Sequence, residues 1–300
     1  MSKESLDTMV YNVVQSVDGV TEDVQVNIQC NYILPNQITH NSKGISIMNY
    51  NIRSMQSNFA NFTAELLDGG RSCDVIGLCE TRLTDATANL YTLNNYSLFS
   101  NNVSSSKGGV CLYLHNRFNC KVRDDLIFKK DHIETIFVEV INDKKPFIIG
   151  MIYRRPGTAI ERFIVDLTRI LDKIKCKCIL LGDFNLNLLN ELNNTQVQNF
   201  VNTFRQYFFK PVITKPTRVC NNSASLIDHI WINFDQVQYV SNIIITGVSD
   251  HFPVLFNVLT HNDRSTKTIS YRRSGNHYDN AFKERLQNAS GYIFQTNHKF

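Results

Sequence analysis

From residue 44 onward, short apolar runs alternate with longer segments of amphipathic character. The short runs are rich in β-branched residues and leucine and end at polar or glycine-containing turns, a pattern typical of buried strands. We expect strands at eight segments, namely 44–51, 75–79, 110–114, 135–141, 147–153, 178–181, 227–232 and 252–259.

Three longer segments carry apolar residues at helical spacing. The first covers 55–67, with Ser54 in the N-cap position and a glycine pair, 69–70, after its end. The second, 160–174, has the most regular amphipathic pattern in the chain, and the third covers 197–208. Each of these helices needs a sheet to cover its apolar face.

These elements predict an α/β (α+β) fold with two packed sheets and outer helices. Consecutive strands joined by short turns favour antiparallel pairing, so the sheets should be mixed but mainly antiparallel. We expect a flexible leader at 1–43, one domain at 44–260, and a polar, basic, linker-like tail at 261–300 with a short helix near 282–286.

Composition adds only broad limits. The 300 residues are 43% hydrophobic and 19% charged, as in a globular protein, and the net charge of +4 is compatible with a polyanionic partner. No segment has the length of a membrane span or the pattern of a signal peptide. The eight cysteines include no Cys-x-x-Cys pair, so we expect free thiols, no disulfide partner and an intracellular, reducing environment.

The polar residues at strand ends carry the functional signal. Asp183 and Asn185 end an apolar strand within Gly-Asp-Phe-Asn, and alternation along a strand predicts that their side chains point the same way. A second segment, Ser249-Asp250-His251, precedes the last strand. Further polar residues at strand ends are Asn51, Glu80, Tyr153 with Arg154, and Asp228 with His229.

This set of residues suits metal-assisted hydrolysis of a phosphodiester. Mg²⁺ prefers carboxylate oxygens and retains several waters, and Glu80 with Asp183 or Asp250 can supply the carboxylates. A carboxylate beside an imidazole fixes the tautomer of the ring and raises its basicity, which makes Asp228 and His251 candidates for water activation. Asn51, Asn185 and Tyr153 can orient phosphate oxygens.

Each residue also has a purely structural interpretation. Glu80 taken alone is more often a turn residue than a ligand, and Asp183 can form an Asx-turn. Ser249 can brace the turn before the last strand. Alternation predicts that His229 points to the face opposite Asp228 and has a structural role. The coincidence of six such elements at strand ends favours the functional interpretation.

Read together, these segments resemble the endonuclease/exonuclease/phosphatase superfamily, and within it the endonuclease domain of non-LTR (LINE-type) retrotransposons. The resemblance covers 44–259. It rests on Met48-Asn49-Tyr50-Asn51, Cys79-Glu80-Thr81, Gly108-Gly109-Val110, Tyr153-Arg154-Arg155-Pro156, Gly182-Asp183-Phe184-Asn185, Ser225-Leu226-Ile227-Asp228-His229-Ile230 and Ser249-Asp250-His251-Phe252-Pro253.

The resemblance implies a four-layer α-β-β-α sandwich and an Mg²⁺-dependent cut in DNA that leaves a 3′-hydroxyl, with Mn²⁺ as an alternative metal. The roles implied for individual residues fall into three groups. The catalytic group is Asp183, Asn185, His251, Asp228 and Tyr153. The metal-binding group is Glu80, Asn51 and Asp250. The substrate-binding group is Arg154, Arg155, Ser225, Ser249 and Arg218.

We therefore expect a retrotransposon-derived endonuclease whose partner is DNA. The tail resembles the segment that links such a domain to reverse transcriptase, so we expect a fragment of a larger polyprotein. A nuclear location follows from the resemblance alone. The alternatives are a phosphatase or phosphodiesterase acting on lipid or small-molecule phosphates, and a catalytically inactive DNA-binding relic. The identity of the general base is open.

Overall fold

A computed structural model describes residues 30–259 of the chain, except 39–43, 69–70, 103–106, 142–145, 221–222 and 235–237. The predicted tail at 261–300 and most of the predicted leader lie outside the described residues.

The described residues form two large sheets and a small hairpin. The first sheet has seven strands in the order β1-β14-β15-β2-β3-β5-β4. In chain order they are β1 (Cys30–Ile33), β2 (Gly44–Asn51), β3 (Val75–Cys79), β4 (Tyr96–Asn101), β5 (Val110–His115), β14 (Gln238–Ile244) and β15 (Val254–Leu259).

The second sheet has six strands in the order β10-β13-β9-β8-β7-β6. Its strands are β6 (Cys120–Val122), β7 (Ile133–Val140), β8 (Phe147–Arg154), β9 (Lys177–Asp183), β10 (Lys210–Pro211) and β13 (Asp228–Ile232). A separate hairpin pairs β11 (Arg218–Cys220) with β12 (Ser223–Ser225). Most pairings are antiparallel, while β2 with β3, β8 with β9 and β1 with β14 are parallel.

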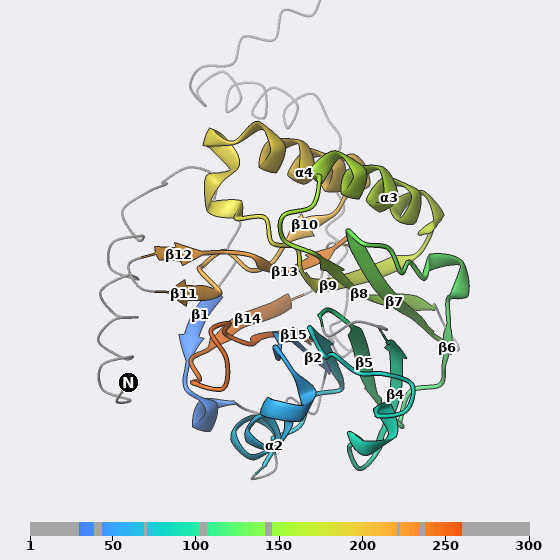
Figure 1. The fold of residues 1–300 in the computed structure, drawn as a ribbon, viewed down its shortest axis with the longest axis vertical. Coiled ribbons are helices and arrows are strands. Elements are labelled where there is room, and N and C mark those ends of the chain that lie inside the picture. Colours follow the sequence, from blue (N-terminus) through green and yellow to red (C-terminus); the bar gives the residue numbers. More distant parts are fainter. Residues whose placement is uncertain are drawn as a thin grey trace, which may run out of the picture. The chain divides into compact units, whose positions relative to one another are not determined.

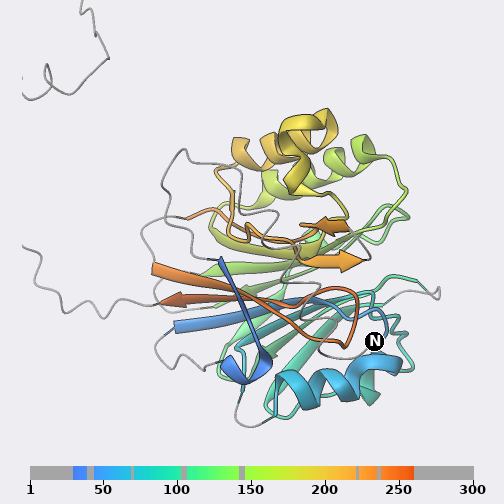
Figure 2. The same ribbon diagram turned by 90° about the vertical axis from the view of Figure 1, so that its left-hand side faces the viewer.

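Helices cover the outer face of each sheet, which gives four layers (Figures 1 and 2). Helix α2 (Met55–Leu66) packs on the first sheet, and helices α3 (Ile160–Lys173) and α4 (Thr195–Gln206) pack on the second. One apolar cluster fills the space between the sheets, and two more lie under the helices. Short 3₁₀ helices occupy Pro35–Gln37, Ala88–Leu90, Asp124–Leu126 and Leu188–Asn193. The predicted fold class is confirmed.

The three predicted helices are present, and side-chain caps explain where α2 and α4 begin. Ser54 Oγ accepts a hydrogen bond from the backbone N–H of Ser57 and so caps α2. Asn194 caps α4 in the same way through the N–H groups of Gln196 and Val197. The apolar stripe of α3 is buried against the second sheet at Phe163, Leu167, Ile170 and Leu171.

The prediction of a flexible leader is wrong for residues 30–33, because they form strand β1 of the first sheet. The strand pairs in parallel with β14, from Cys30 beside Ser241 to Ile33 beside Ile244. Its partner lies about two hundred residues further along the chain, so no local pattern indicated the pairing. The ordered domain therefore begins before residue 44.

Six further strands were not predicted, namely β4, β6, β10, β11, β12 and β14. β4, β6, β10 and β14 lie at or near a sheet edge, and β11 and β12 form the separate hairpin; most of their residues are only partly buried or exposed. Edge strands of this kind tolerate polar residues on both faces, so the apolar alternation that indicates a strand is weak. In β14, for example, Ser241 and Asn242 interrupt the apolar run.

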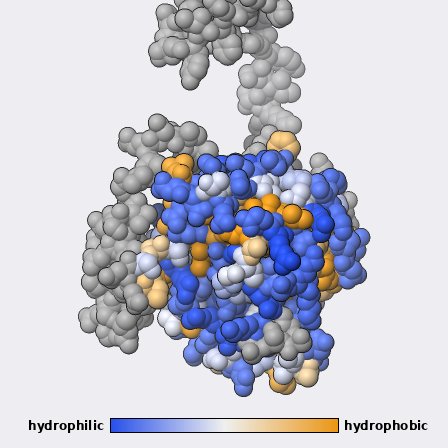
Figure 3. Space-filling view, turned by 45° about the horizontal axis from the view of Figure 1, so that its top comes forward, coloured by the Kyte–Doolittle hydropathy of each residue, from blue (hydrophilic) through white to orange (hydrophobic). Residues whose placement is uncertain are grey.

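Hydrophilic side chains cover most of the face shown in Figure 3, with a smaller apolar strip between them. None of the helices within the described residues has the length and apolar character that a membrane span requires. All eight cysteines fall within the described residues and are free thiols, as predicted.

Candidate active site

Three of the predicted site residues form a row across the second sheet. Tyr153 on β8 lies beside Asp183 on β9, and Asp183 lies opposite Asp228 on β13. Residues in register on neighbouring strands point to the same face of a sheet, so the three side chains converge although the chain separates them widely. The sheet thus brings two carboxylates and a phenol together at one end of its inner strands β8, β9 and β13.

Asp183 is the last residue of β9, and the chain turns sharply after it. Asn185 adopts a positive φ of 50° and donates its N–H to Asp183 Oδ1 at 2.9 Å, which forms an Asx-turn. The expectation that Asp183 and Asn185 project together along a strand is wrong, because the strand has already ended. The Nδ2 of Asn185 donates instead to the carbonyl of Arg154 at 2.8 Å.

A glycine must precede Asp183 because another strand lies too close for a side chain. A Cβ placed on Gly182 would lie 1.9 Å from the carbonyl oxygen of Ile152 on β8. Gly182 therefore permits the close approach of β8 and β9 that aligns Tyr153 with Asp183.

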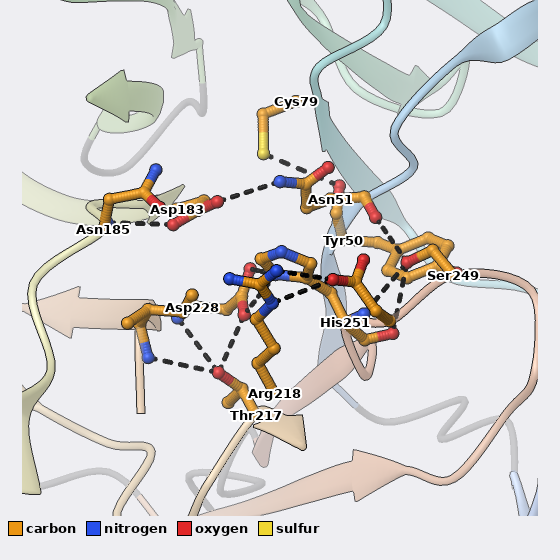
Figure 4. Close-up of polar contacts among 12 residues, drawn as sticks. Tyr50, Asn51, Cys79, Asp183, Asn185, Thr217, Arg218, Asp228, Ser249 and His251 are labelled. Atoms are coloured by element: carbon orange, nitrogen blue, oxygen red, sulfur yellow. Dashed lines mark hydrogen bonds and ion pairs between the residues drawn. The ribbon is translucent and has the colours of Figure 1, made fainter. Parts of the chain in front are cut away.

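Asn51 links the two sheets at the site. It ends β2 of the first sheet, and its Nδ2 donates to Asp183 Oδ2 at 2.8 Å and to Glu80 Oε1 at 2.9 Å (Figure 4 shows Asn51 and Asp183). Tyr153 also donates its hydroxyl to Glu80 Oε1, at 3.2 Å. Glu80 follows β3 with a positive φ of 51°, a conformation that costs free energy in a non-glycine residue and that is often found at functional sites.

Asp228 and His251 form the predicted carboxylate–imidazole pair. His251 Nδ1 lies 2.9 Å from Asp228 Oδ2, and both side chains are buried. Thr217 completes the arrangement, since its hydroxyl donates to the same Oδ2 at 2.7 Å (Figure 4). The backbone N–H of Asp228 in turn donates to Thr217 Oγ1 at 3.1 Å, which fixes the position of the carboxylate.

Burial and neighbouring charges shift the pKa values of this group. Burial and the adjacent charge of Asp228 raise the pKa of Asp183 to about 7. Burial opposes a charge on His251, but the attraction of Asp228, Asp183 and Asp250 outweighs it and raises the pKa of the imidazole to about 9. At neutral pH the imidazole is therefore a cation, and Asp183 exchanges its proton readily. Burial and the charge of Glu80 raise the pKa of Tyr153, which keeps its hydroxyl a donor.

Asp250 has different partners from those predicted. Its carboxylate lies 2.7 Å from Arg218 and 3.0 Å from Arg53, and these guanidinium groups hold its pKa low, together with His251, against the effect of burial. In the described part of the chain no contact joins Asp250 to Glu80 or Asn51. Asp250 thus lies apart from the other two residues predicted to bind metal, and its charge is balanced by arginine.

Two sets of described residues are candidates to hold a divalent metal. Asp183, Asp228 and His251 place one ligand atom each within 4.8 Å of one another. Protonated His251 cannot donate a lone pair, so this set suits a cation poorly at neutral pH. Glu80 fits better, since its Oε2 has no hydrogen bond within the described residues and the Asp183 carboxylate shares the Asn51 Nδ2 donor with it. Asn51 presents no oxygen there, because its Oδ1 accepts from the N–H of Arg53.

Four of the residues predicted to bind substrate form hydrogen bonds or ion pairs within the protein. Arg154 is buried and donates to the carbonyl oxygens of Thr158 and Asn185, because the residue after Tyr153 points to the opposite face of β8. Its assignment to substrate binding is wrong.

The other four residues of the predicted substrate-binding group stay partly exposed. Ser249 donates to the carbonyl of Asn51 and accepts from the N–H of His251, so the bracing role is the correct interpretation. Arg155 forms an ion pair with Glu134 and Arg218 one with Asp250, but both remain partly exposed at the rim of the site. Ser225 is half-buried in β12, opposite Arg218.

Sequence reasoning missed Thr217, Arg53 and Glu134. Thr217 lies in an irregular segment with no pattern that singles it out. Glu134 left a weak signal, since it is a charged residue within the otherwise apolar start of β7. His229 has the structural role predicted for it: its ring stacks on Phe184 at 5.0 Å, and burial lowers its pKa to about 4.

The sequence of residues 48–251, more than two thirds of the chain, matches the family model described as Endonuclease/Exonuclease/phosphatase family. The chain belongs to this family. No curated protein sequence matches it.

Several solved structures share the fold of this endonuclease/exonuclease/phosphatase family member. The endonuclease domain of TRAS1, a telomere-specific non-LTR retrotransposon, aligns with a TM-score of 0.55 and 14% identity, over 72% of this chain and 99% of that one. The Xenopus laevis APE2 catalytic domain gives 0.51 and 18%, over 73% and 94%. D. rerio TDP2 complexed with single-strand DNA product gives 0.53 and 15%, over 73% and 100%. At these identities the likeness concerns the fold.

Proposed function

We propose that this protein is a Mg²⁺-dependent endonuclease that nicks DNA by hydrolysis of a phosphodiester and leaves a 3′-hydroxyl. The observation that carries the proposal is the position of Asn51, whose amide binds Asp183 and Glu80 at once and so places a proton-accepting carboxylate beside a metal-binding one. The buried Asp228–His251 pair supplies a cation next to them.

We infer a role for each of these groups from the geometry. Asp183, with its pKa near 7, accepts a proton from the attacking water. Protonated His251, held through Nδ1 by Asp228, donates to a phosphate oxygen through Nε2 and stabilises the negative charge of the transition state. As water bonds to phosphorus, the bond from phosphorus to the 3′ oxygen breaks, and this oxygen takes up a proton from solvent water to give the 3′-hydroxyl and a 5′-phosphate.

Glu80 would hold the metal, with Asp183 adjacent, whereas Asn51 orients both carboxylates through its Nδ2 donor. When bound, Mg²⁺ would withdraw electron density from the phosphate and offset its charge. Tyr153 and Asn51 fix the Glu80 carboxylate from two sides, so this chain presents an ordered oxygen ligand in advance.

DNA as the substrate is supported by the cations at the rim and by the fold relatives. Arg53, Arg155 and Arg218 stay partly exposed around the site, where they can contact phosphates on either side of the cut. TRAS1, a non-LTR retrotransposon, has an endonuclease domain of this fold, and TDP2 was solved with single-strand DNA product.

We infer the same retrotransposon origin here, with a reverse transcriptase domain in the parent polyprotein and a nuclear location.

The test is nicking of supercoiled plasmid by the purified full chain in Mg²⁺, in Mn²⁺ and in EDTA. We expect metal-dependent conversion to open circles, and extension of the nick by a DNA polymerase, which requires a 3′-hydroxyl. Asp183→Ala should abolish cleavage. Asp172→Ala is the matched control, because Asp172 is an exposed aspartate of α3 whose partner is Tyr207.

Two other results would separate the alternatives. Phosphate release from inositol phosphates or phosphoinositide vesicles without nicking would replace the DNA substrate with a small phosphoester. Salt-sensitive DNA binding without hydrolysis of any of these substrates would make the protein a DNA-binding relic.

A further inference from the structure

A fourth residue, Glu134, stands in the same row as Tyr153, Asp183 and Asp228. It lies opposite Tyr153 in the pairing of β7 with β8, which extends the row over four strands of the second sheet. Its carboxylate is fully buried and belongs to none of the roles assigned above. A buried carboxylate is costly unless it is paired, so its partners show what it does.

The Glu134 carboxylate binds groups from two different places. Oε1 accepts from Arg155 Nε at 2.8 Å, and Oε2 accepts from the backbone N–H of Gly109. Arg155 also donates to the carbonyl of Lys107, the neighbour of Gly108. Because Gly109 immediately precedes β5 of the first sheet, this carboxylate connects the two sheets.

The glycine pair is shaped to receive the carboxylate. Gly108 and Gly109 have φ values of +89° and +92°, which side chains rarely permit. A Cβ on Gly108 would lie 2.4 Å from Glu134 Oε1, and one on Gly109 would lie 2.5 Å from Thr81 Oγ1. The loop therefore fits between Glu134 on one side and the turn after Glu80 on the other.

The same loop fixes the backbone that carries Glu80. The carbonyl of Gly109 accepts from the N–H of Thr81 at 3.2 Å, and that of Gly108 accepts from the N–H of Arg82 at 2.8 Å. Both Glu80 and Arg82 have positive φ values, so this turn is strained and needs external support. The second sheet therefore contacts the Glu80 turn in two ways. Glu134 reaches the turn through the glycine loop, and Tyr153, which lies opposite Glu134 on β8, donates a hydrogen bond to Glu80 directly.

We propose that Glu134, neutralised by Arg155, is a positioning residue that sets the Glu80 carboxylate for metal binding through Gly108 and Gly109. The inference rests on the proposed function in that Glu80 is taken as the metal ligand. Residues that orient a ligand typically change metal affinity by about 10- to 100-fold when they are removed. Loss of Glu134 should therefore weaken metal binding rather than DNA binding.

The experiment measures Mn²⁺ binding to the full chain by isothermal titration calorimetry, and separately the Mg²⁺ concentration for half-maximal nicking. We expect Glu134→Ala to weaken Mn²⁺ binding and to raise the half-maximal Mg²⁺ concentration, each by about tenfold or more, while the KM for plasmid changes little. Glu134→Gln keeps an acceptor for Gly109 but loses the ion pair, and should lie between the wild type and Glu134→Ala.

The matched control is Glu139→Ala. Glu139 lies on the same strand but forms ion pairs with Lys121 and Arg123 at the other end of β7, so its loss should leave both measurements unchanged. If Glu134→Ala fails to fold, as judged by circular dichroism, Glu134→Gln provides the measurement, with a weakening of about threefold or more expected.

Unchanged Mn²⁺ affinity in a folded Glu134 variant would overturn the inference, even if activity falls. A loss of affinity equal to that of Glu139→Ala would overturn it as well. The proposed function can fail separately: if wild-type protein binds Mn²⁺ but does not nick DNA, the comparison of affinities still decides the role of Glu134.

Discussion

Asp228 holds His251 through a 2.9 Å contact between Oδ2 and Nδ1, and the register of β13 with β9 places the same aspartate directly opposite Asp183. One carboxylate therefore raises the pKa of two neighbours, one by attraction and the other by repulsion. It favours the proton on His251 by attraction and favours the proton on Asp183 by repulsion.

Replacement of Asp228 by Asn should consequently move both pKa values toward their ordinary ranges. We expect the pKa of His251 to fall below its value of about 9, and nicking at pH 8 to fall by about 100-fold, because the imidazole loses its charge and its fixed orientation. Titration of the imidazole nitrogens by NMR measures the shift. A His251 pKa that does not change in the variant would remove Asp228 as its cause.

The pH dependence of nicking should be bell-shaped. Asp183 must be deprotonated to accept a proton from water, so the rate should rise as pH passes about 7. His251 must be protonated to donate to phosphate, so the rate should fall as pH passes about 9. The measurement is the initial nicking rate at saturating Mg²⁺ from pH 5.5 to 10. In Asp228→Asn both limbs should move to lower pH, because the charge of Asp228 raises both pKa values, and a profile identical to that of the wild type would contradict the assignment.

Thr217 should contribute to both stability and activity. Its hydroxyl donates to Asp228 Oδ2 and accepts from the N–H groups of Ile227 and Asp228, all of them buried. Thr217→Val leaves these groups without a partner and should cost about 1–3 kcal/mol in the free energy of unfolding. It should also lower the nicking rate, since Asp228 loses a fixed contact.

Urea denaturation and plasmid nicking measure the two effects of Thr217→Val. Thr203→Val is the control, because Thr203 is also buried but its hydroxyl donates to the Asn199 carbonyl within α4, far along the chain from Asp228. Equal losses of activity in the two variants would show that Thr217 has no special connection to the site.

His229 should limit stability in mild acid. Burial among Phe184, Phe200 and Trp231 lowers its pKa to about 4, while in the unfolded chain the ordinary value is near 6.5. Between these two values the unfolded state binds a proton that the folded state does not, so the free energy of unfolding should decrease as pH falls from about 6.5 to 4. The whole effect is of order 3 kcal/mol.

Thermal denaturation between pH 4 and 8 measures this dependence. In His229→Phe the loss of stability on acidification should be smaller than in the wild type, although the variant also loses the hydrogen bond to the Leu226 carbonyl at every pH. Equal acid sensitivity in both proteins would assign the effect to other groups.

Much of this site could be predicted because the decisive signals are local. Apolar runs located β2, β3, β8, β9 and β13, and the polar residue at the end of each run follows from the sequence directly. The Asp228–His251 pair was predicted from chemistry, as an aspartate and a histidine at two strand ends. The same local reasoning failed at Asn185 and Arg154, since each depends on the residue at which a strand ends or on which face it presents.

Other features had no local signal at all. Strand β1 depends on a partner strand more than two hundred residues away. The Asp250–Arg218 ion pair joins residues 32 positions apart, one in the bend before β15 and the other in the short strand β11. Thr217 and Glu134 acquire their contacts only when strands from separate parts of the chain lie side by side.

The sequence by itself determined the three helices and eight of the strands, that two sheets pack beneath outer helices, and which kinds of side chain stand at the strand ends. Those properties depend on hydrophobic periodicity and on residue chemistry, which are read along the chain. Only the tertiary structure decided that four residues share one row of the second sheet, namely Glu134, Tyr153, Asp183 and Asp228. It also decided that Asp250 forms an ion pair with Arg218 and that Asn51 joins the two sheets. Register, strand order and distance across the sandwich are relations between distant segments, and they are fixed by the packing of the whole domain.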